Sequence, residues 1–268
     1  MSTQKLATSP WGFRETPLAE QCKWLQDQGL SYICGQSTDE FAGTFKPDIT
    51  DAEIAEANAL VQAHGLRFAS FNAGGDFMVS DDVAGQIATC CKDIDLAAKF
   101  KPELIIVFVG WQDREDDAVY EQVSSSLKQV ARHAAKYNLT VAVETHGGLM
   151  STGAQCNRLI AGADEPNLGI NYDPANFALY SGTDPLAELK ATDVPVVFTH
   201  FKSMRHENGT KKFCRLADGE LDYVPILQTL KDRGYDGIYA IEYEEPSDVF
   251  EGSTDDLNEL KRLLAAVT

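Results

Sequence analysis

The sequence contains no run of about 18 apolar residues, so we expect no helix that spans a membrane. Its first residues, MSTQKLATSPWGF, lack a basic segment followed by an apolar one, which predicts no secretory signal. The six cysteines, at positions 22, 34, 90, 91, 156 and 214, show no CxxC spacing. Thiols without a disulfide or metal-site spacing are typical of a reducing compartment, and a cytoplasmic location is therefore expected.

Positive charge is also scarce. The chain has 23 lysines and arginines against 41 aspartates and glutamates, which gives a formal net charge of −18 at pH 7. A surface this acidic repels nucleic-acid phosphates, and the one modestly basic segment, FKSMRHENGTKKFCR at 201–215, is too small to reverse that field. The composition therefore predicts no nucleic-acid partner and favours a small-molecule ligand.

No Pro-, Gly- or Ser-rich linker divides the 268 residues, and no GxGxxG motif follows the first apolar run. The missing linker favours a single domain over residues 1–268. The missing glycine motif removes the main signal for a dinucleotide-binding fold. A content of 44% hydrophobic and 24% charged residues is ordinary for a soluble globular protein.

Eight short, β-rich apolar runs alternate with helix-forming stretches along the chain. Most runs lack alternating polar positions, as expected for strands that are covered on both faces of a parallel sheet. Eight such units in a chain of about 250–270 residues predict a closed (β/α)8 TIM barrel. The runs are KLATS at 5–9 and the segments 31–35, 66–75, 103–110, 139–146, 168–176, 194–202 and 237–245.

The stretches between these runs carry helix signals. One helix is expected to begin at Thr50, with Glu53 completing a capping box, and to stop at Gly65. Another, over 17–30, has Gly29 in the role of C-cap. The remaining predicted helices lie within 81–100, 116–137, 151–163, 184–192, 221–234 and 255–267.

The last four apolar runs each end in a side chain that can bind a metal. They deliver Glu144 in VAVETHGG, Asp173 in NYDPAN, His200 in FTHFKS and Glu242 in AIEYEE. The gaps between them are 29, 27 and 42 residues; the first two match one βα unit each, and the third holds an extra loop over 203–219. Because the active site of such a barrel is built at the C-terminal strand ends, we expect these four side chains to converge.

Three carboxylates and one imidazole are mostly hard oxygen donors. They favour a single divalent cation, Mn²⁺ or Mg²⁺, with Co²⁺ or Zn²⁺ as alternatives. Taken singly, Asp173 before Pro174 could start a turn, and His200 could be a core histidine. Four such coincidences at equivalent positions on consecutive strands favour the metal site.

The motifs VAVETHGG, INYDPANF, FTHFKS and LADGELDYVPILQTLKDRGYDGIYAIEYE resemble the xylose isomerase-like sugar isomerase/epimerase family. This family includes ketose 3-epimerases, hydroxypyruvate-type isomerases, inosose dehydratases and dehydroshikimate dehydratases. The resemblance covers essentially the whole chain and is most specific from Val141 to Glu245. It implies that one catalytic divalent metal is bound by Glu144, Asp173, His200 and Glu242. It also implies that in an epimerase the two glutamates exchange protons with substrate carbon.

The resemblance suggests further contacts to substrate. Arg215, just ahead of LADGELD, resembles the family arginine that holds a substrate oxygen beside the metal. Asn176 takes a position where some epimerases of the family carry histidine. Lys202 lies two residues after His200, so strand alternation points it to the same side of the barrel wall, where it would neutralise carboxylates or hold a substrate oxygen. His146 would bind a substrate hydroxyl or support a carboxylate.

Aromatic residues follow several of the predicted strands. Trp11 and Phe13 come after the first run, Phe71 lies on the third, and Trp111 follows the fourth. Flat apolar faces suit stacking against the C–H face of a sugar, although aromatic residues are more often plain core. Trp111 is the strongest candidate for a substrate contact.

We therefore predict a sugar isomerase or epimerase that acts by proton transfer through an enediolate on a ketose, aldose or related polyhydroxy carbonyl substrate. Glu144 and Glu242 would be the catalytic acid–base pair. The alternative is a metal-dependent dehydratase or lyase acting on a keto-sugar or keto-cyclitol, which begins with the same proton abstraction. An abasic-site nuclease is disfavoured by only five histidines and the excess of acid, and a non-catalytic sugar-binding barrel by the four intact ligand positions.

Two further expectations concern assembly and movement. A homo-oligomer, a dimer or tetramer, is expected only because relatives in such families commonly associate. The loop over 203–219 carries lysines and arginines and is expected to close over the substrate.

Overall fold

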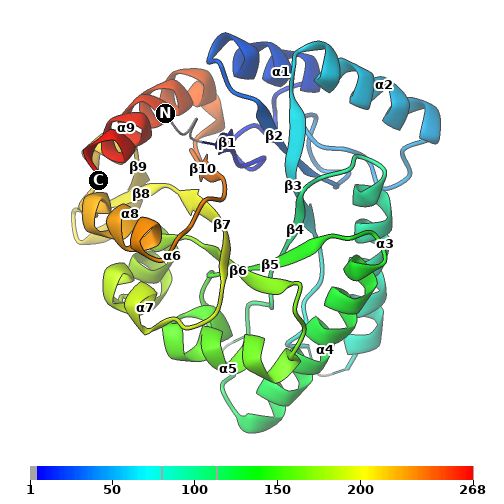
Figure 1. Cartoon of the computed structure of the whole chain (residues 1–268), viewed down its shortest axis with the longest axis vertical. Helices are drawn as coiled ribbons and strands as arrows, with labels where there is room; N and C mark the ends of the chain where they lie inside the picture. The colour runs from blue at the N-terminus through cyan, green and yellow to red at the C-terminus, as the bar shows by residue number, and fades with distance from the viewer. Residues whose placement is uncertain (1–4, 80, 113, 268) are drawn as a thin grey trace.

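The computed structural model describes residues 5–79, 81–112 and 114–267, and over this range eight parallel strands form one nearly closed barrel (Figure 1). The strands follow the order β1–β10–β7–β6–β5–β4–β3–β2. The predicted (β/α)8 barrel is confirmed. Its strands are β1 (Leu6–Thr8), β2 (Tyr32–Gln36), β3 (Arg67–Ala73), β4 (Leu104–Val107), β5 (Thr140–Glu144), β6 (Leu168–Tyr172), β7 (Val196–Phe201) and β10 (Tyr239–Ile241).

The last strand of the barrel completes the ring between the first strand and β7. β10 pairs in parallel with β1 on one side, with Thr8 opposite Ile241, and with β7 on the other, with His200 opposite Ala240. The Ser9 amide extends the first pairing by donating to the Ile241 carbonyl at 2.7 Å. β1 and β2 end the hydrogen-bonded order and lie beside each other. Residues from the two ends of the chain therefore meet at one rim.

Within the described residues, eight α-helices longer than α6 (Pro174–Asn176) surround the barrel between and after the strands (Figure 1). The capping box predicted at Thr50 is present, since its hydroxyl accepts from the Glu53 amide while the Glu53 carboxylate accepts from the Thr50 amide. The last helix begins six residues before its predicted start, directly after a 3-10 turn over Pro246–Asp248. The helices are α1 (Leu18–Asp27), α2 (Asp51–Ala63), α3 (Val83–Ala98), α4 (Asp117–Ala135), α5 (Gly153–Ala163), α7 (Pro185–Ala191), α8 (Tyr223–Asp232) and α9 (Val249–Ala266).

Apolar side chains fill two layers. A smaller cluster lies inside the barrel, and a larger one lies between the strands and the helices. β4 contributes to both, because Leu104 and Ile106 belong to the inner cluster while Ile105 and Val107 pack in the outer one. This alternation explains why the run over 103–110 is apolar at nearly every position.

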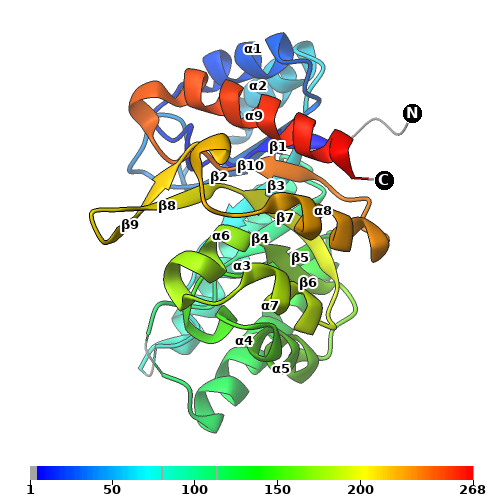
Figure 2. The ribbon, with the colours of Figure 1, turned by 90° about the vertical axis from the view of Figure 1, so that its left-hand side faces the viewer.

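The segment after β7, predicted as an extra loop, forms an antiparallel hairpin of β8 (Ser203–Glu207) and β9 (Thr210–Cys214). Figure 2 shows it projecting from the barrel. Its turn residues Asn208 and Gly209 both have positive φ, 53° and 79°, as a two-residue hairpin turn requires. The sequence signal for this hairpin was the Asn-Gly pair between two short runs.

Short helical turns complete the rim. β6 is followed by α6 (Pro174–Asn176) and by the π-helical turn η2 (Phe177–Ser181), while η1 (Gly148–Met150) follows β5. A 3-10 turn, η3 (Leu216–Asp218), follows the hairpin. None of the described helices is both long and apolar enough to cross a membrane.

Candidate metal centre and active site

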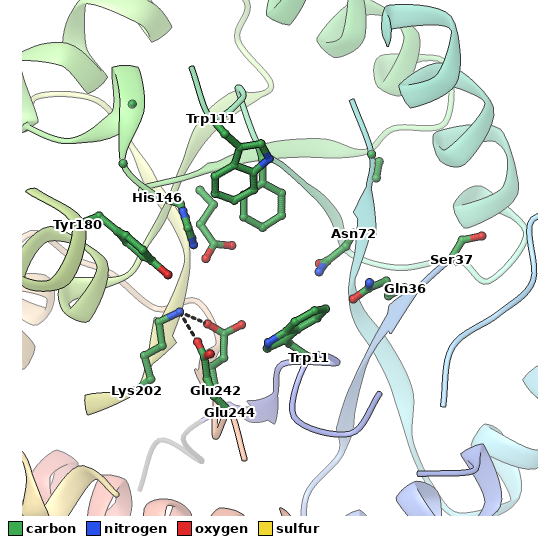
Figure 3. Close-up of a pocket in the computed structure, with 16 residues that line it drawn as sticks. Trp11, Gln36, Ser37, Asn72, Trp111, His146, Tyr180, Lys202, Glu242 and Glu244 are labelled. Atoms are coloured by element: carbon green, nitrogen blue, oxygen red, sulfur yellow. Dashed lines mark hydrogen bonds and ion pairs between the residues drawn. The ribbon is translucent and has the colours of Figure 1, made fainter. Parts of the chain in front are cut away.

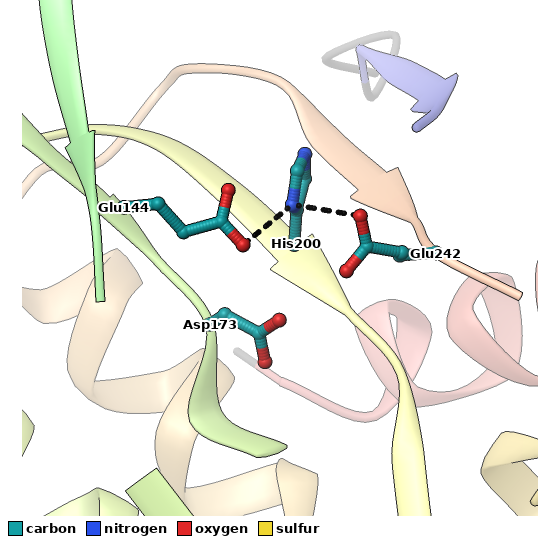
Figure 4. Close-up of side chains that lie close together, drawn as sticks. All are labelled: Glu144, Asp173, His200 and Glu242. Carbon is teal, nitrogen blue, oxygen red and sulfur yellow. Dashed lines mark ion pairs between the residues drawn. The ribbon is translucent and has the colours of Figure 1, made fainter. Parts of the chain in front are cut away.

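Four side chains from consecutive strands converge at the C-terminal rim of the barrel (Figure 4). Each offers one ligand atom, and these atoms all lie within 4.8 Å of one another. All four residues are buried, with exposures of 6% or less. They are the predicted set, Glu144, Asp173, His200 and Glu242.

Strand alternation explains why three of these side chains point inward. Residues two positions apart on a strand face the same side of the sheet. Two residues before each of Glu144, His200 and Glu242 lies a member of the cluster inside the barrel. Those members are Ala142, Phe198 and Ala240.

Asp173 reaches the same point by a different route, as the residue that caps α6. Its Oδ1 accepts hydrogen bonds from the Ala175 amide at 2.9 Å and the Asn176 amide at 3.2 Å. Its Oδ2 is buried and has no hydrogen bond, although it lies 3.2 Å from Lys202 Nζ as an ion pair. One oxygen of Asp173 is thus fixed by backbone, and the other is available to a ligand.

Glu144 accepts its hydrogen bonds from neutral amides. Asn171, its neighbour across the β5–β6 ladder, donates from Nδ2 to Glu144 Oε2 at 3.0 Å. The side chain of Asn176 donates to Glu144 Oε1 at 3.3 Å. Asn171 Nδ2 also lies 3.2 Å from Nδ1 of His200. These contacts orient the carboxylate without pairing it to a lysine or arginine.

Glu242, in contrast, is held by a cation and a hydroxyl. Ser9 donates to Glu242 Oε1 at 2.6 Å, and Lys202 Nζ donates to Glu242 Oε2 at 2.6 Å. The same ammonium donates to Glu244 Oε1 at 2.9 Å and pairs with Asp173. Lys202, which is 4% exposed, therefore neutralises the site as predicted for one of its two roles.

This crowding of buried charges shifts several pKa values. Burial alone would lower the pKa of His200, but the Glu242 and Glu144 carboxylates raise it to about 9. Burial alone would raise the pKa of Glu242, but Lys202 and His200 lower it to about 2. Burial raises the pKa of Asp173 to about 7 although Lys202 opposes this effect. The pKa of Lys202 lies well above its ordinary value, because the carboxylates outweigh burial.

The donor set fits one divalent cation. Nδ1 of His200 faces two carboxylates, 3.3 Å from Glu242 Oε1 and 3.5 Å from Glu144 Oε1. Buried carboxylates this close together require a compensating cation, and the unbonded Asp173 Oδ2 adds a further oxygen donor. Three carboxylates and an imidazole match the ligands of divalent metals.

A cavity of about 720 Å³ opens over this cluster (Figure 3). Glu144, Lys202 and Glu242 contribute to its floor. Four of the five predicted substrate-contact residues therefore lie at the cavity or on its carboxylates: His146, Trp111 and Lys202 line it, and Asn176 contacts Glu144.

His146 and Trp111 belong to an aromatic wall of the cavity. Their rings meet edge to face with centroids 4.5 Å apart, and Tyr180 of η2 lies against the other side of His146 at 4.3 Å. Burial lowers the pKa of His146, so its imidazole is neutral at pH 7. Trp111 is 62% exposed, and an exposed ring at a cavity mouth suits stacking on a ligand.

Arg215 is placed elsewhere. Its guanidinium donates to Asp248, Glu251 and Asp255 at the start of α9, and it is not among the residues that line the cavity. The family resemblance suggested that Arg215 holds a substrate oxygen beside the metal. The hairpin returns the chain so that Cys214 lies opposite Ser203, but the Arg215 guanidinium binds the acids at the start of α9 instead of entering the cavity. In this structure its contacts tie the end of the hairpin to α9.

The other aromatic candidates divide between cavity and core. Trp11 lines the cavity, with Arg14 stacked 4.5 Å from its ring. Phe13 and Phe71 are buried in the outer apolar layer.

Several site residues escaped sequence reasoning. Glu244 and Tyr180 line the cavity, and Ser9, directly after β1, donates to Glu242. Gln36 is the last residue of β2, and Asn72 lies on β3. Both side chains also line the cavity. Polar residues at the ends of apolar strands were the signal for the metal ligands, and the same signal was present at Gln36 and Asn72.

The fold and the buried cluster together define a (β/α)8 barrel with a candidate metal site at the C-terminal strand ends. A model of the xylose isomerase-like TIM barrel family matches residues 22–265, and the chain belongs to this family.

Individual relatives differ in their named activities. Inosose dehydratase of Lactiplantibacillus plantarum is 30% identical over 147 residues, covering 48% of each chain, so the chain spans about half the length of the curated relatives it matches. A structure of L-ribulose 3-epimerase superposes with a TM-score of 0.80 at 14% identity, covering 98% of this chain and 95% of that one. The IOLI protein, solved with a zinc atom, superposes with a TM-score of 0.81 at 16% identity, covering 99% of both. These two structural likenesses concern the fold.

Proposed function

We propose that the protein is a divalent-metal-dependent sugar isomerase or epimerase that moves a proton next to the carbonyl of a ketose, aldose or related polyhydroxy compound. The observation that carries the proposal is the pair of buried glutamates, Glu144 and Glu242, at the floor of a large cavity and on either side of His200. A bound divalent ion, Mn²⁺ or Mg²⁺ by the hardness of the donors, would supply a Lewis acid next to the substrate carbonyl. Glu144, Asp173, His200 and Glu242 would hold it.

The two glutamates are not equivalent. Glu144 accepts hydrogen bonds from two neutral amides and pairs with no lysine or arginine, so its carboxylate is the better placed to take the proton from carbon. Glu242 is fixed by Ser9 and by the Lys202 ammonium. This difference favours a single base that returns the proton to a neighbouring carbon, which is isomerisation, over exchange between two equal bases.

The remaining cavity residues have supporting roles. Neutral His146 can exchange a hydrogen bond with a substrate hydroxyl, and Trp111 and Tyr180 provide apolar faces for the C–H side of the substrate. Lys202 can donate a hydrogen bond to a substrate oxygen next to Glu242.

A second candidate, a dehydratase acting on a keto-sugar or keto-cyclitol, is favoured by one feature of the site. The Lys202 ammonium is a buried proton donor beside the carboxylate cluster, where it could protonate a leaving hydroxyl after Glu144 removes the α-proton. The partial similarity to an inosose dehydratase supports this candidate as well.

Deuterium incorporation separates the two candidates. Protein loaded with Mn²⁺ or Mg²⁺ is incubated in D₂O with pooled ketoses, aldoses and keto-cyclitols, and the products are measured by mass spectrometry and NMR. Deuterium at carbon with the formula otherwise kept supports an isomerase or epimerase, and the labelled carbon distinguishes these. Loss of water supports the dehydratase.

A matched pair of variants tests the role of the base. Glu144→Gln is expected to slow deuterium incorporation by about 10²–10⁴-fold. Glu56→Gln, on the exposed face of α2, serves as the control and should leave the rate unchanged. No deuterium with any compound, or full incorporation by Glu144→Gln, would refute the proposed function.

A further inference from the structure

The cavity wall farthest from Lys202 and Tyr180 comes from the N-terminal half of the barrel and is polar but uncharged (Figure 3). Gln36 and Ser37 come from the end of β2, and Asn72 comes from β3. The side chains of Gln36 and Asn72 point across the cavity toward Glu242, where the far end of a bound substrate would lie, whereas the Ser37 hydroxyl points away from it (Figure 3).

Each of these side chains has an oxygen without a partner. Gln36 Oε1, Ser37 Oγ and Asn72 Oδ1 are shielded from water and form no hydrogen bond with the described residues. Buried acceptors without a donor are costly, and native proteins rarely leave them so. A ligand that brings hydroxyl donors to this wall would satisfy them, whereas a phosphate or carboxylate group at pH 7 brings mainly acceptors.

The charges of the cavity lining also favour an uncharged ligand. Among the described residues that line it, Glu144, Glu242 and Glu244 are acidic and Lys202 is the single lysine or arginine. That ammonium already pairs with three carboxylates, Asp173, Glu242 and Glu244. A divalent cation bound by the cluster would offset these charges without leaving an excess of positive charge for an anionic substituent.

Two cations that contact residues at the rim of the cavity donate to backbone carbonyls. Arg14 donates to the carbonyls of Trp11 and Glu244, and Lys211 donates to those of Ala178 and Leu179. Neither side chain is positioned to receive a phosphate at the uncharged wall.

We infer that the substrate is a neutral polyhydroxy carbonyl compound, a free sugar or keto-cyclitol without phosphate or carboxylate, and that Gln36 and Asn72 select it by binding its hydroxyls. This inference rests on the proposed function and narrows its substrate class. It assigns specificity to the N-terminal strands β2 and β3, while the metal ligands come from β5, β6, β7 and the residues after β10.

Binding to matched pairs of compounds tests the inference. The Mn²⁺-loaded protein is titrated by calorimetry with D-fructose and D-fructose 6-phosphate, D-ribulose and D-ribulose 5-phosphate, D-glucose and D-glucuronate, and a keto-inositol. Tryptophan fluorescence gives a second readout, because Trp11 and Trp111 line the cavity. At least one neutral compound should bind, and its charged counterpart should bind at least tenfold more weakly.

Variants connect the selectivity to the uncharged wall. Gln36→Leu and Asn72→Leu should each weaken binding of the neutral ligand about tenfold, with Mn²⁺ affinity unchanged. Gln62→Leu, on the exposed face of α2, is the matched control and should bind as the parent protein does. Gln36→Lys should reduce the difference in binding affinity between a neutral sugar and its phosphate, because the substitution brings a cation to the uncharged wall.

The outcomes separate this inference from the proposed function. Tighter binding of any phosphorylated or carboxylated member, binding of no neutral member, or unchanged affinity in both leucine variants would overturn the inference. A neutral compound that binds but gains no deuterium in D₂O and loses no water would instead count against the proposed function. A phosphorylated sugar that binds best and exchanges deuterium would leave the proposed function standing and refute the inference.

Discussion

Lys202 is the residue on which the charge balance of the site depends. Its ammonium lies within 3.2 Å of oxygens of Asp173, Glu242 and Glu244, all in a region from which water is largely excluded. In the metal-free protein it is the main partner of these carboxylates, together with His200. Substitution of Lys202 should therefore lower the stability of the metal-free protein, apart from any effect on the rate of the reaction.

Lys202→Met is expected to lower the free energy of unfolding of the metal-free protein by about 3 kcal/mol at pH 8, because it leaves buried carboxylates without their cation. Mn²⁺ should restore much of this loss, and the increase in Tm on adding Mn²⁺ should be larger than in the parent protein. Lys212→Met, which removes an exposed partner of Glu207, is the control and should change stability little. Equal stability of Lys202→Met and Lys212→Met would contradict this account.

His200 and Asp173 give the metal-free protein a defined pH dependence. The pKa of His200 is raised to about 9 by carboxylates, so its contribution to stability is complete below its ordinary value of 6.5 and is lost as the pH rises through 9. Burial raises the pKa of Asp173 to about 7, so its charging also opposes folding as the pH rises through 7. Urea unfolding at pH 6.5, 7.5 and 9 should show decreasing stability.

Two comparisons test this assignment. His200→Gln should flatten the dependence between pH 7.5 and 9, and Mn²⁺ should reduce it in the parent protein, because bound metal replaces the protons. Stability that increases from pH 6.5 to 9 without metal would show that other groups dominate.

Residues of the metal cluster were predictable because each ends a strongly apolar strand, and that pattern requires only local sequence. The contacts of Arg215 were not predictable in this way, since they depend on the path of the hairpin and on the acids of α9. The hydroxyl of Ser9 was equally hidden, because its bond to Glu242 joins residues 233 positions apart.

At the scale of elements, the β8–β9 hairpin links two parts of the rim. Lys211 of β9 donates to the carbonyls of Ala178 and Leu179 in η2, the turn that carries Tyr180 to the cavity. At its far end, Arg215 fixes the chain to α9. The closure of segment 203–219 over a substrate stays a prediction, and these contacts identify what would have to move with it.

Lys211→Met should loosen η2. Hydrogen exchange measured by mass spectrometry should become faster in peptides covering 177–182 and 203–214, while peptides from α2 keep their rates. The neighbouring Lys212→Met is again the control, because its side chain pairs with Glu207 within the hairpin. Unchanged exchange in η2 would mean that the hairpin does not stabilise this turn.

Element positions followed from sequence more closely than element ends. Seven of the eight barrel strands lie within their predicted runs, and β2 extends one residue beyond its run, to Gln36. The agreement arises because the alternation of apolar strands and amphipathic helices is repeated along the chain. The start of α9 was missed because the acidic stretch after β10 lacks a periodic apolar face, and the hairpin was missed because its strands are half exposed.

At the scale of the whole molecule, the net charge of −18 is the dominant long-range feature. Like charges on a compact surface repel one another, and salt shortens the range of that repulsion from about 30 Å at 0.01 M to about 8 Å at 0.15 M. Raising NaCl from 10 to 150 mM should therefore raise Tm. Choline chloride should act equally if screening is the cause, and a fall in Tm would indicate that surface ion pairs outweigh the repulsion.

The closure of the barrel also sets the order in which the site can be made during translation. Ser9 leaves the ribosome early, but its partner Glu242 follows 233 residues later, after β10 has been synthesised to lie between β1 and β7. A nascent chain that already displays Glu144, Asp173 and His200 lacks the fourth ligand and the strand pairing that positions it. The complete cation site, and with it any reaction that depends on the ion, therefore arises only when the barrel itself is finished.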